Sequence, residues 1–180
     1  MEEKENLRNK AKIIRKTLDI VQVSKILTEK IQQNELYQNA DNVMIFYPAK
    51  YEIDLRALLS DKKYFYLPRV EGKNLEVCPY KIGDTLIKSR FCIMEPVNCG
   101  VSPNVLDLVI VPALMADSKG YRLGYGCGFY DRFLSGKYKF KTICAIPKEL
   151  QVKDLAHDEF DIPAGIHIPV ISLQEFSTAY

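Results

Sequence analysis

Three short, almost wholly apolar runs, each ended by a proline, most constrain how this chain can fold. They are NVMIFYP at residues 42–48, DLVIVP at 107–112 and KTICAIP at 141–147. An apolar run of this length without polar alternation is typical of a strand with both faces buried, and proline does not continue such a strand. Segments with helical spacing separate the runs, which favours a parallel sheet covered on both faces.

Two amphipathic helices are expected before the first run. In the first segment, apolar residues recur at spacings of four and three, at Leu7, Ala11, Ile14 and Leu18. In the second they lie between residues 23 and 31, and Asn34 is a typical end signal. Two further helices are predicted, at 53–60 and 129–136. Strands are predicted at 63–70 and 75–80, and an edge strand is expected in the tail that runs from 157 to 172. The chain is expected to be irregular through 91–98.

The order of these elements indicates one domain. They alternate without repeats, low-complexity segments or linkers, and 180 residues suffice to bury a core. We therefore predict a single α/β domain over residues 1–180, with three layers formed by a mainly parallel central sheet flanked by helices. Lys and Arg exceed Asp and Glu by 25 − 23 = 2, so the net charge gives no sign of a nucleic-acid partner.

Targeting signals and cysteine usage favour the cytoplasm. The charged N-terminus, MEEKENLRNKAKIIRK, lacks the apolar core of a signal peptide, and no run approaches the roughly 18 apolar residues of a membrane span. The five cysteines are odd in number and form no C-x-x-C pair. We expect reduced thiols in a cytoplasmic protein, without a membrane partner.

The stretch LGYGCGFYD at residues 123–131 places three glycines at alternate positions between a strand and a short helix. Bare backbone there permits either close packing in a turn or amide groups that face an anion, to which Arg122 would add a permanent charge. Known phosphate motifs do not fit. The Walker motif needs Gly-Lys-Ser/Thr, and the dinucleotide and kinase motifs need a glycine where Phe129 stands.

A row of basic residues lies along one flank of the first predicted helix. At about 100° per residue, its four members fall within roughly a quarter-turn of the surface: Lys4, Arg8, Lys12 and Arg15. Such a row is either a solvated face or a set of cations aimed at phosphates.

Several carboxylates have two interpretations. Asp131 either compensates the dipole of the short helix or binds Mg²⁺, with Asp158 or Asp161 as a second ligand. Glu52 either begins a helix or accepts hydrogen bonds from an amino-substituted heterocycle, on which Tyr47 could stack.

Three other residues are weaker candidates. Glu95 precedes a proline, so its extended backbone can aim the carboxylate into a cleft. Cys127 could be a thiol nucleophile, but no histidine is near it in sequence. His157 is more typical of a structural residue.

The assembled residues resemble the 5-formyltetrahydrofolate cyclo-ligase family. The strongest match is DLVIVPALMADSKGYRLGYGCGFYDRFL at 107–134, which is similar to the family's strand followed by R-L-G-x-G-x-G-[YF]-Y-D. Shorter matches occur in the family's order: Lys4-x-x-x-Arg8, FYPAKYEID, LPRV, MEP, and His157-Asp158.

The resemblance implies an α/β fold and an ATP- and Mg²⁺-dependent reaction. ATP would phosphorylate the formyl oxygen of 5-formyltetrahydrofolate, and the neighbouring nitrogen would attack the activated carbon. Phosphate and ADP would leave, with 5,10-methenyltetrahydrofolate as the product. The implied substrates are ATP and 5-formyltetrahydrofolate, with or without a polyglutamate tail. We expect the protein to be a monomer.

The resemblance also implies roles for particular residues. Arg122 and Tyr130 would be catalytic, and Asp131 and Asp158 would hold Mg²⁺. ATP would be bound by Lys4, Arg8, Arg122, Leu123, Gly124, Tyr125, Gly126, Cys127, Gly128, Phe129 and Tyr130. The folate would be bound by Tyr47, Glu52, Tyr125, Gly126, Cys127, Gly128 and Phe129.

The chain departs from the family pattern at two places. Many members have Gly or Lys where this chain has Cys127, and Ala113 and Met115-Ala116 replace part of a Gly-Leu-x-Phe-Asp run. One alternative is therefore a non-catalytic protein that sequesters formylfolate. Another is a sugar-phosphate isomerase or acyl-transfer enzyme, in which Lys4 and Arg8 would have no task.

Overall fold

A five-stranded sheet forms the centre of the computed structural model, which describes residues 2–163. Its strands are, in spatial order, β3 (Asn74–Tyr80), β2 (Tyr64–Glu71), β1 (Asn42–Met44), β6 (Leu108–Ile110) and β9 (Lys141–Ile143). β1 pairs in parallel with β2 and β6, and β6 with β9, whereas β2 and β3 are antiparallel. The predicted mainly parallel sheet is confirmed. Most of the expected tail strand lies outside the described residues.

Both faces of the sheet are buried, as the continuous apolar runs require. Along β1 and β6, Val43 and Leu108 point into one core and Met44 and Val109 into the other, and all four are fully buried. Successive side chains of a strand point to opposite faces, so each run supplies both cores.

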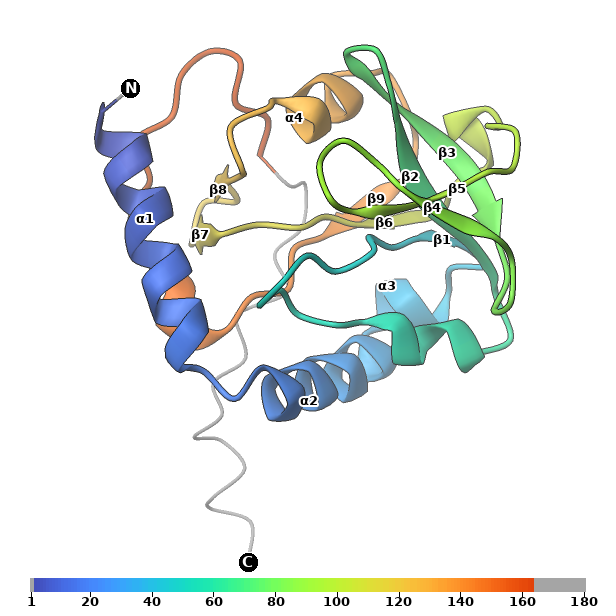
Figure 1. Cartoon of the computed structure of the whole chain (residues 1–180), viewed down its shortest axis with the longest axis horizontal. Helices are drawn as coiled ribbons and strands as arrows, with labels where there is room; N and C mark the ends of the chain where they lie inside the picture. The colour runs from blue at the N-terminus through green and yellow to red at the C-terminus, as the bar shows by residue number, and fades with distance from the viewer. Residues whose placement is uncertain (1, 164–180) are drawn as a thin grey trace, which may run out of the picture.

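Helices lie on both sides of the sheet (Figure 1). α2 (Ile20–Gln33) and α3 (Glu35–Gln38) cover one face, α4 (Phe129–Leu134) covers the other, and α1 (Glu2–Thr17) stands at one end of the sheet. Asp19 caps α2 by accepting a hydrogen bond from the Gln22 amide, and Asn34 closes α2 and caps α3. The predicted three-layer α/β class is confirmed.

Two local predictions were wrong. Residues 53–60 were expected to form a helix, but a 3₁₀-helix, η1 (Arg56–Ser60), forms only after an extended start. The stretch 91–98 was expected to be irregular, yet it contains β5 (Met94–Pro96), which pairs with β4 (Leu86–Lys88). Strands of three residues are too short for alternation to be recognised, and the proline suggested a loop.

A small second sheet brings the glycine stretch into place. It consists of β10 (Gln151–Val152), β7 (Met115–Asp117) and β8 (Arg122–Leu123), and the 3₁₀-helices η2 (Pro103–Val105) and η3 (Lys148–Leu150) lie in neighbouring loops. The buried Asp117 accepts hydrogen bonds from the amides of Lys119, Tyr121 and Leu155. It therefore fixes both the β7–β8 turn and the start of the loop after β10. No helix within residues 2–163 combines the length and apolar character needed to cross a bilayer.

Candidate functional site

A cavity of about 1080 Å³ lies beyond the carboxyl ends of β1 and β6. Phe46 and Tyr47, which follow β1, line it together with Pro112, which follows β6. Ligands of open α/β sheets bind at this edge. Every residue predicted to bind ATP, folate or metal borders this one cavity: Lys4, Arg8, Tyr47, Glu52, Arg122, Leu123, Gly124, Tyr125, Gly126, Cys127, Gly128, Phe129, Tyr130, Asp131 and Asp158.

The glycine stretch needs bare backbone at two positions. Gly126 has a φ of +101°, and Gly128, the residue before α4, has a φ of +65°. These left-handed conformations are unfavourable for side chains with a Cβ. A Cβ on Gly126 would also lie 3.3 Å from the guanidinium carbon of Arg8, whose Nε donates to the Gly124 carbonyl at 3.0 Å. The loop is therefore shaped by the close approach of α1.

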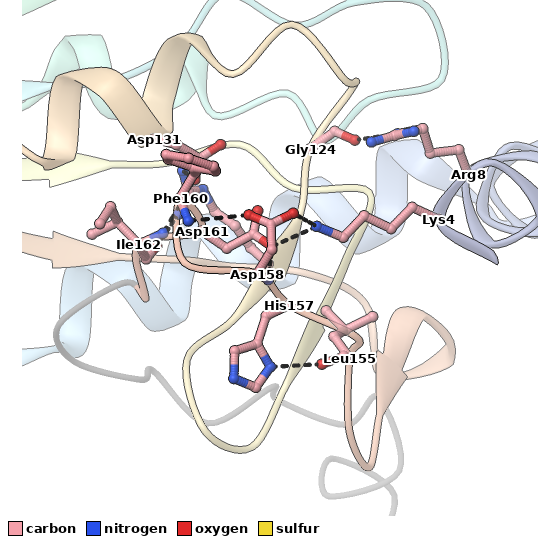
Figure 2. Close-up of polar contacts among 11 residues, drawn as sticks. Lys4, Arg8, Gly124, Asp131, Leu155, His157, Asp158, Phe160, Asp161 and Ile162 are labelled. Atoms are coloured by element: carbon pink, nitrogen blue, oxygen red, sulfur yellow. Dashed lines mark hydrogen bonds and ion pairs between the residues drawn. The ribbon is translucent and has the colours of Figure 1, made fainter. Parts of the chain in front are cut away.

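The basic row of α1 does not form one solvated face. Lys4 and Arg8 point from α1 toward Asp158, Asp161 and Gly124 (Figure 2). Arg15 is buried, whereas Lys12 is exposed to solvent. Three members of the row therefore point toward the protein and one points away.

Lys4 joins α1 to the loop that follows β10. Its Nζ donates to Asp158 Oδ2 at 2.9 Å and to Asp161 Oδ2 at 2.5 Å. Burial lowers the pKa of Lys4, but the hydrogen bonds and charges of Asp161 and Asp158 outweigh burial and raise it above its ordinary value. The hydrogen bond from Lys4 also lowers the pKa of Asp158. Lys4 is therefore a cation, and Asp158 an anion, at neutral pH.

A second ion pair lies between Arg122 and Asp131. The Arg122 side chain is 3% exposed, and its Nη2 donates to Asp131 Oδ1 at 2.8 Å. Its Nη1 donates to the carbonyl of Ile162 at 2.6 Å. Asp131 Oδ1 also accepts a hydrogen bond from the Ile162 amide at 3.5 Å (Figure 2). Arg122 and Lys4 therefore hold the loop after β10 from two sides of the cavity.

Glu52 lies in a buried network with Arg15 and Tyr125. Its Oε1 accepts from the Tyr125 hydroxyl at 2.7 Å and lies 3.6 Å from Arg15 Nη1, while its Oε2 accepts from the Ala49 amide at 2.9 Å. Arg15 also donates to the Tyr125 hydroxyl and to the Ala113 carbonyl. Burial and the Glu52 charge raise the pKa of Tyr125, which stays protonated and can donate. The network connects α1, the segment after β1 and the glycine stretch.

Aromatic side chains form much of the remaining wall. Phe129 meets Phe91 edge to face with ring centroids 5.3 Å apart, and the guanidinium of Arg56 lies over the ring of Tyr47. The Tyr130 hydroxyl is buried and has no hydrogen-bond partner in the part of the chain that the structure describes. Burial raises the pKa of Tyr130, so its hydroxyl keeps its proton.

The structure gives His157 structural contacts. The ring of His157 stacks on Tyr121 at 3.7 Å between centroids, and its Nδ1 lies 3.1 Å from the Leu155 carbonyl. Cys127 is exposed and its carbonyl accepts a hydrogen bond from Arg132. Within the part of the chain that the structure describes, no cysteine–histidine contact of the kind that activates a thiol is found at either residue.

The carboxylates are suited to share a metal with a phosphate ligand. Among residues 2–163, no group of three or more His, Cys, Asp or Glu side chains is arranged to hold a metal ion. Asp131 and Asp158 nevertheless border the same cavity, and Mg²⁺ is usually bound by one or two carboxylates together with substrate phosphates and water. The donor set therefore fits Mg²⁺ when phosphate oxygens complete it.

Sequence reasoning missed two contributions to the cavity. Phe91 was placed in an irregular stretch, and Arg15 was not paired with Glu52, from which it is separated by 37 positions in the sequence. No sequence signal links these residues, because the fold alone brings them together. Glu95 had been noted only for its position before a proline, and it is buried at the cavity wall.

Comparisons with known proteins agree on one family. The model of the "5-formyltetrahydrofolate cyclo-ligase family" matches residues 1–167. A 5-formyltetrahydrofolate cyclo-ligase of Haemophilus influenzae is 31% identical over 141 residues, covering 70% of this chain and 74% of that protein. The mouse protein of the same name is 28% identical over 125 residues, and the match spans 62% of each chain.

A solved structure is also similar over nearly the whole chain. The NMR structure of Aquifex aeolicus 5,10-methenyltetrahydrofolate synthetase superposes with a TM-score of 0.79 and 29% identity. The match covers 91% of this chain and 88% of that one.

Proposed function

The chain is an enzyme that belongs to the 5-formyltetrahydrofolate cyclo-ligase family, and from this premise we propose that it converts 5-formyltetrahydrofolate to 5,10-methenyltetrahydrofolate at the expense of ATP. The observation that carries the proposal is the single cavity, which is bordered by cations and glycine backbone as well as by apolar walls with buried carboxylates. Such a cavity suits a phosphate donor and a heterocyclic acceptor bound side by side. The free thiols of all five cysteines support a cytoplasmic location, and we expect a monomer.

The proposed reaction has two steps. The formyl oxygen attacks the γ-phosphorus of ATP, and ADP leaves. The neighbouring nitrogen of the folate then attacks the formyl carbon and gives up its N–H proton. The carbon–oxygen bond breaks, and phosphate leaves with the formyl oxygen and takes up the equivalent of that proton. The protein's part in such a reaction is to position the two substrates and to stabilise charge.

The phosphates are proposed to bind between α1 and the glycine stretch. Lys4, Arg8 and Arg122 supply positive charge from two sides of the cavity, and the backbone of Gly124 to Gly128 can approach phosphate oxygens without a side chain between them. Leu123, Tyr125, Cys127, Phe129 and Tyr130 complete this wall, and Arg122 and Tyr130 are proposed to act at the transferred group.

The folate is proposed to occupy the part of the cavity beside β1. Tyr47 and Glu52, which follow β1, border the cavity, and so do the residues from Tyr125 to Phe129, which we propose lie between the two substrates. The protonated Tyr125 and the ring of Phe129 would face the folate from this segment.

Mg²⁺ is proposed to bind to Asp131 and Asp158, where it would neutralise charge on the phosphate oxygens. Without ligands, these carboxylates are paired with Arg122 and Lys4. Binding would therefore exchange partners: the cations turn to phosphate as the carboxylates turn to metal. When a phosphate takes the cation of an ion pair, the carboxylate of that pair becomes available to Mg²⁺, and when Mg²⁺ takes the carboxylate, the cation becomes available to phosphate. We therefore expect ATP and Mg²⁺ to strengthen each other's binding.

The proposal is tested by mixing the protein with 5-formyltetrahydrofolate, ATP and Mg²⁺ and following the absorbance of the methenyl product. We expect product only when ATP is present, with one ADP released for each methenyl group. Folate binding without ATP-dependent product would instead support sequestration of formylfolate.

Replacing Asp131 by Asn should raise the Mg²⁺ concentration required for half-maximal activity by about tenfold or more, because one of two charged ligands is lost. Asparagine keeps an acceptor for Arg122, so the loop contact survives. The measurement is a Mg²⁺ titration at fixed ATP. Asp154→Asn is the matched control, since Asp154 is exposed, pairs with Lys119 and does not border the cavity. An unchanged titration for Asp131→Asn would remove Asp131 from the metal site.

Replacing Cys127 by Ser should keep turnover within about twofold of the wild type, because the side chain is exposed and serine is of similar size. The Cys127 carbonyl, which binds Arg132, is retained. The assay is the same methenyl absorbance. Complete loss of activity in a folded variant would restore the thiol-nucleophile hypothesis.

A further inference from the structure

Two exposed arginines from different elements meet beside the cavity. Arg90 lies at the tip of the β4–β5 hairpin, and Arg132 lies in α4 and borders the cavity. Arg90 Nη2 donates to the Gly72 carbonyl at 3.3 Å, and Arg132 Nε donates to the Lys73 carbonyl at 2.8 Å. These carbonyls are successive in the turn between β2 and β3, which lies beside α4 (Figure 1), so the two guanidinium groups are held near each other.

An aromatic pair connects the two arginines. The guanidinium carbon of Arg90 lies 4.9 Å from the centroid of the Phe91 ring, and that of Arg132 lies 5.3 Å from the centroid of the Phe129 ring. The two rings contact each other edge to face, and both border the cavity. Two aromatic rings in the cavity wall therefore adjoin two cations at its exposed edge.

The charges of this arginine pair have no counterion in the protein. Within residues 2–163, the two guanidinium groups donate hydrogen bonds to backbone carbonyls alone, and neither forms an ion pair with a carboxylate. The cations of the proposed phosphate site differ in this respect, because Lys4 and Arg122 are paired with aspartates. Like charges that are held together repel each other, and an anion bound between them would relieve the repulsion.

A ligand that fits this place has an aromatic ring followed by carboxylates. The tail of 5-formyltetrahydrofolate has this form: a benzoyl ring is joined to a glutamate, and both carboxylates of the glutamate are ionised at neutral pH. The ring can lie against Phe91 and Phe129, and guanidinium groups match the geometry of carboxylates. The pterin ring would remain beside Tyr47 and Glu52, as proposed above.

We propose that Arg90 and Arg132 bind the glutamate carboxylates of the folate and thereby favour folates over pterins that lack an anionic tail. This inference rests on the proposed function, because it takes a folate as the ligand of the cavity. Both arginines would be specificity residues that touch the tail and not the reacting atoms. Their contacts would be the same before and during the reaction, so their loss should raise KM and leave kcat nearly unchanged.

The test compares two ligands by calorimetry in the absence of ATP. The first is 5-formyltetrahydrofolate, and the second is its diamide, in which carboxamides replace both glutamate carboxylates. The wild type should bind the diamide about tenfold or more weakly than the first ligand. Arg90→Gln should bind 5-formyltetrahydrofolate about 5- to 10-fold more weakly than the wild type does, and the diamide within about twofold. Arg132→Gln should show the same selective loss.

Two controls separate the tail from other anions and from net charge. Lys141→Gln removes an exposed positive charge at the start of β9, at the edge of the sheet opposite the cavity, and should bind both ligands as the wild type does. Arg90→Gln should also bind ATP with Mg²⁺ within about twofold of the wild type. A selective loss of ATP affinity would instead assign Arg90 to the phosphates and refute its role at the tail.

Three further results would overturn the assignment: both arginine variants bind 5-formyltetrahydrofolate normally, both lose the two ligands equally, or Lys141→Gln shows the same selective loss. A wild-type protein that binds no 5-formyltetrahydrofolate would refute the proposed function and with it the tail site. A wild-type protein that turns the folate over but binds the folate and its diamide equally would refute the tail site alone.

Discussion

Replacement of Arg15 by Met should lower the free energy of unfolding by about 3–5 kcal/mol, the usual cost of removing one partner of a buried ion pair. The Arg15 and Glu52 side chains are 5% and 4% exposed, and methionine would fill the space without neutralising Glu52. The Tyr125 hydroxyl and the Ala113 carbonyl would each lose a donor as well. The measurement is urea denaturation followed by circular dichroism.

Lys12→Met is the matched control, because Lys12 belongs to the same basic row of α1 but is exposed. Its effect should stay within about 0.5 kcal/mol. Adding Glu52→Gln to Arg15→Met should recover part of the lost stability, since the unpaired buried charge is then absent. Equal effects of Arg15→Met and Lys12→Met would show that the buried pair does not stabilise the fold.

Much of the fold could be predicted because short continuous segments of the sequence determine it. The runs at 42–48, 107–112 and 141–147 carry enough apolar residues to bury two faces, so they had to be strands of a sheet that is covered on both sides. The hairpin of β4 and β5 could not be predicted in the same way. Its strands have three residues each, and their pairing depends on tertiary contacts.

The site was predictable where its residues follow one another and unpredictable where distant segments meet. The glycine stretch could be interpreted from nine consecutive residues. The contact of Lys4 with Asp158 spans 154 positions, and that of Arg15 with Tyr125 spans 110. Helical periodicity placed Lys12 and Arg15 in one row, but only the packing of α1 decides that one of them is buried.

The ion pairs of the site explain how several cations, and several carboxylates, can lie around one cavity without strong repulsion before any ligand binds. Arg122 with Asp131, and Lys4 with Asp158 and Asp161, offset each other's charge and hold the loop after β10 in place. Phosphates and a metal ion bring charges of both signs, so they can replace these partners together more readily than either can alone. We expect the coupling of the two ligands to follow from this exchange of partners.

Replacing Gly126 by Ala should weaken ATP binding by about tenfold or more and lower stability by about 1–2 kcal/mol. The loss of stability arises from the left-handed backbone, with φ at +101°. The loss of affinity arises from the added Cβ, which would lie 3.3 Å from Arg8 Cζ and would displace that guanidinium from the phosphate site. ATP affinity is measured by calorimetry with Mg²⁺ present.

Gly83→Ala separates the two causes. Gly83 has a φ of +100°, has open space where a Cβ would be built and does not border the cavity, so it carries the strain alone. We expect the two variants to lose similar stability, and only Gly126→Ala to lose affinity for ATP. Equal ATP affinities of the Gly126→Ala and Gly83→Ala variants would mean that glycine is needed at position 126 only for the left-handed backbone of the turn. The approach of Arg8 would then contribute nothing to phosphate binding. A selective loss would establish that the glycine is required because α1 and the nucleotide meet at this point of the loop.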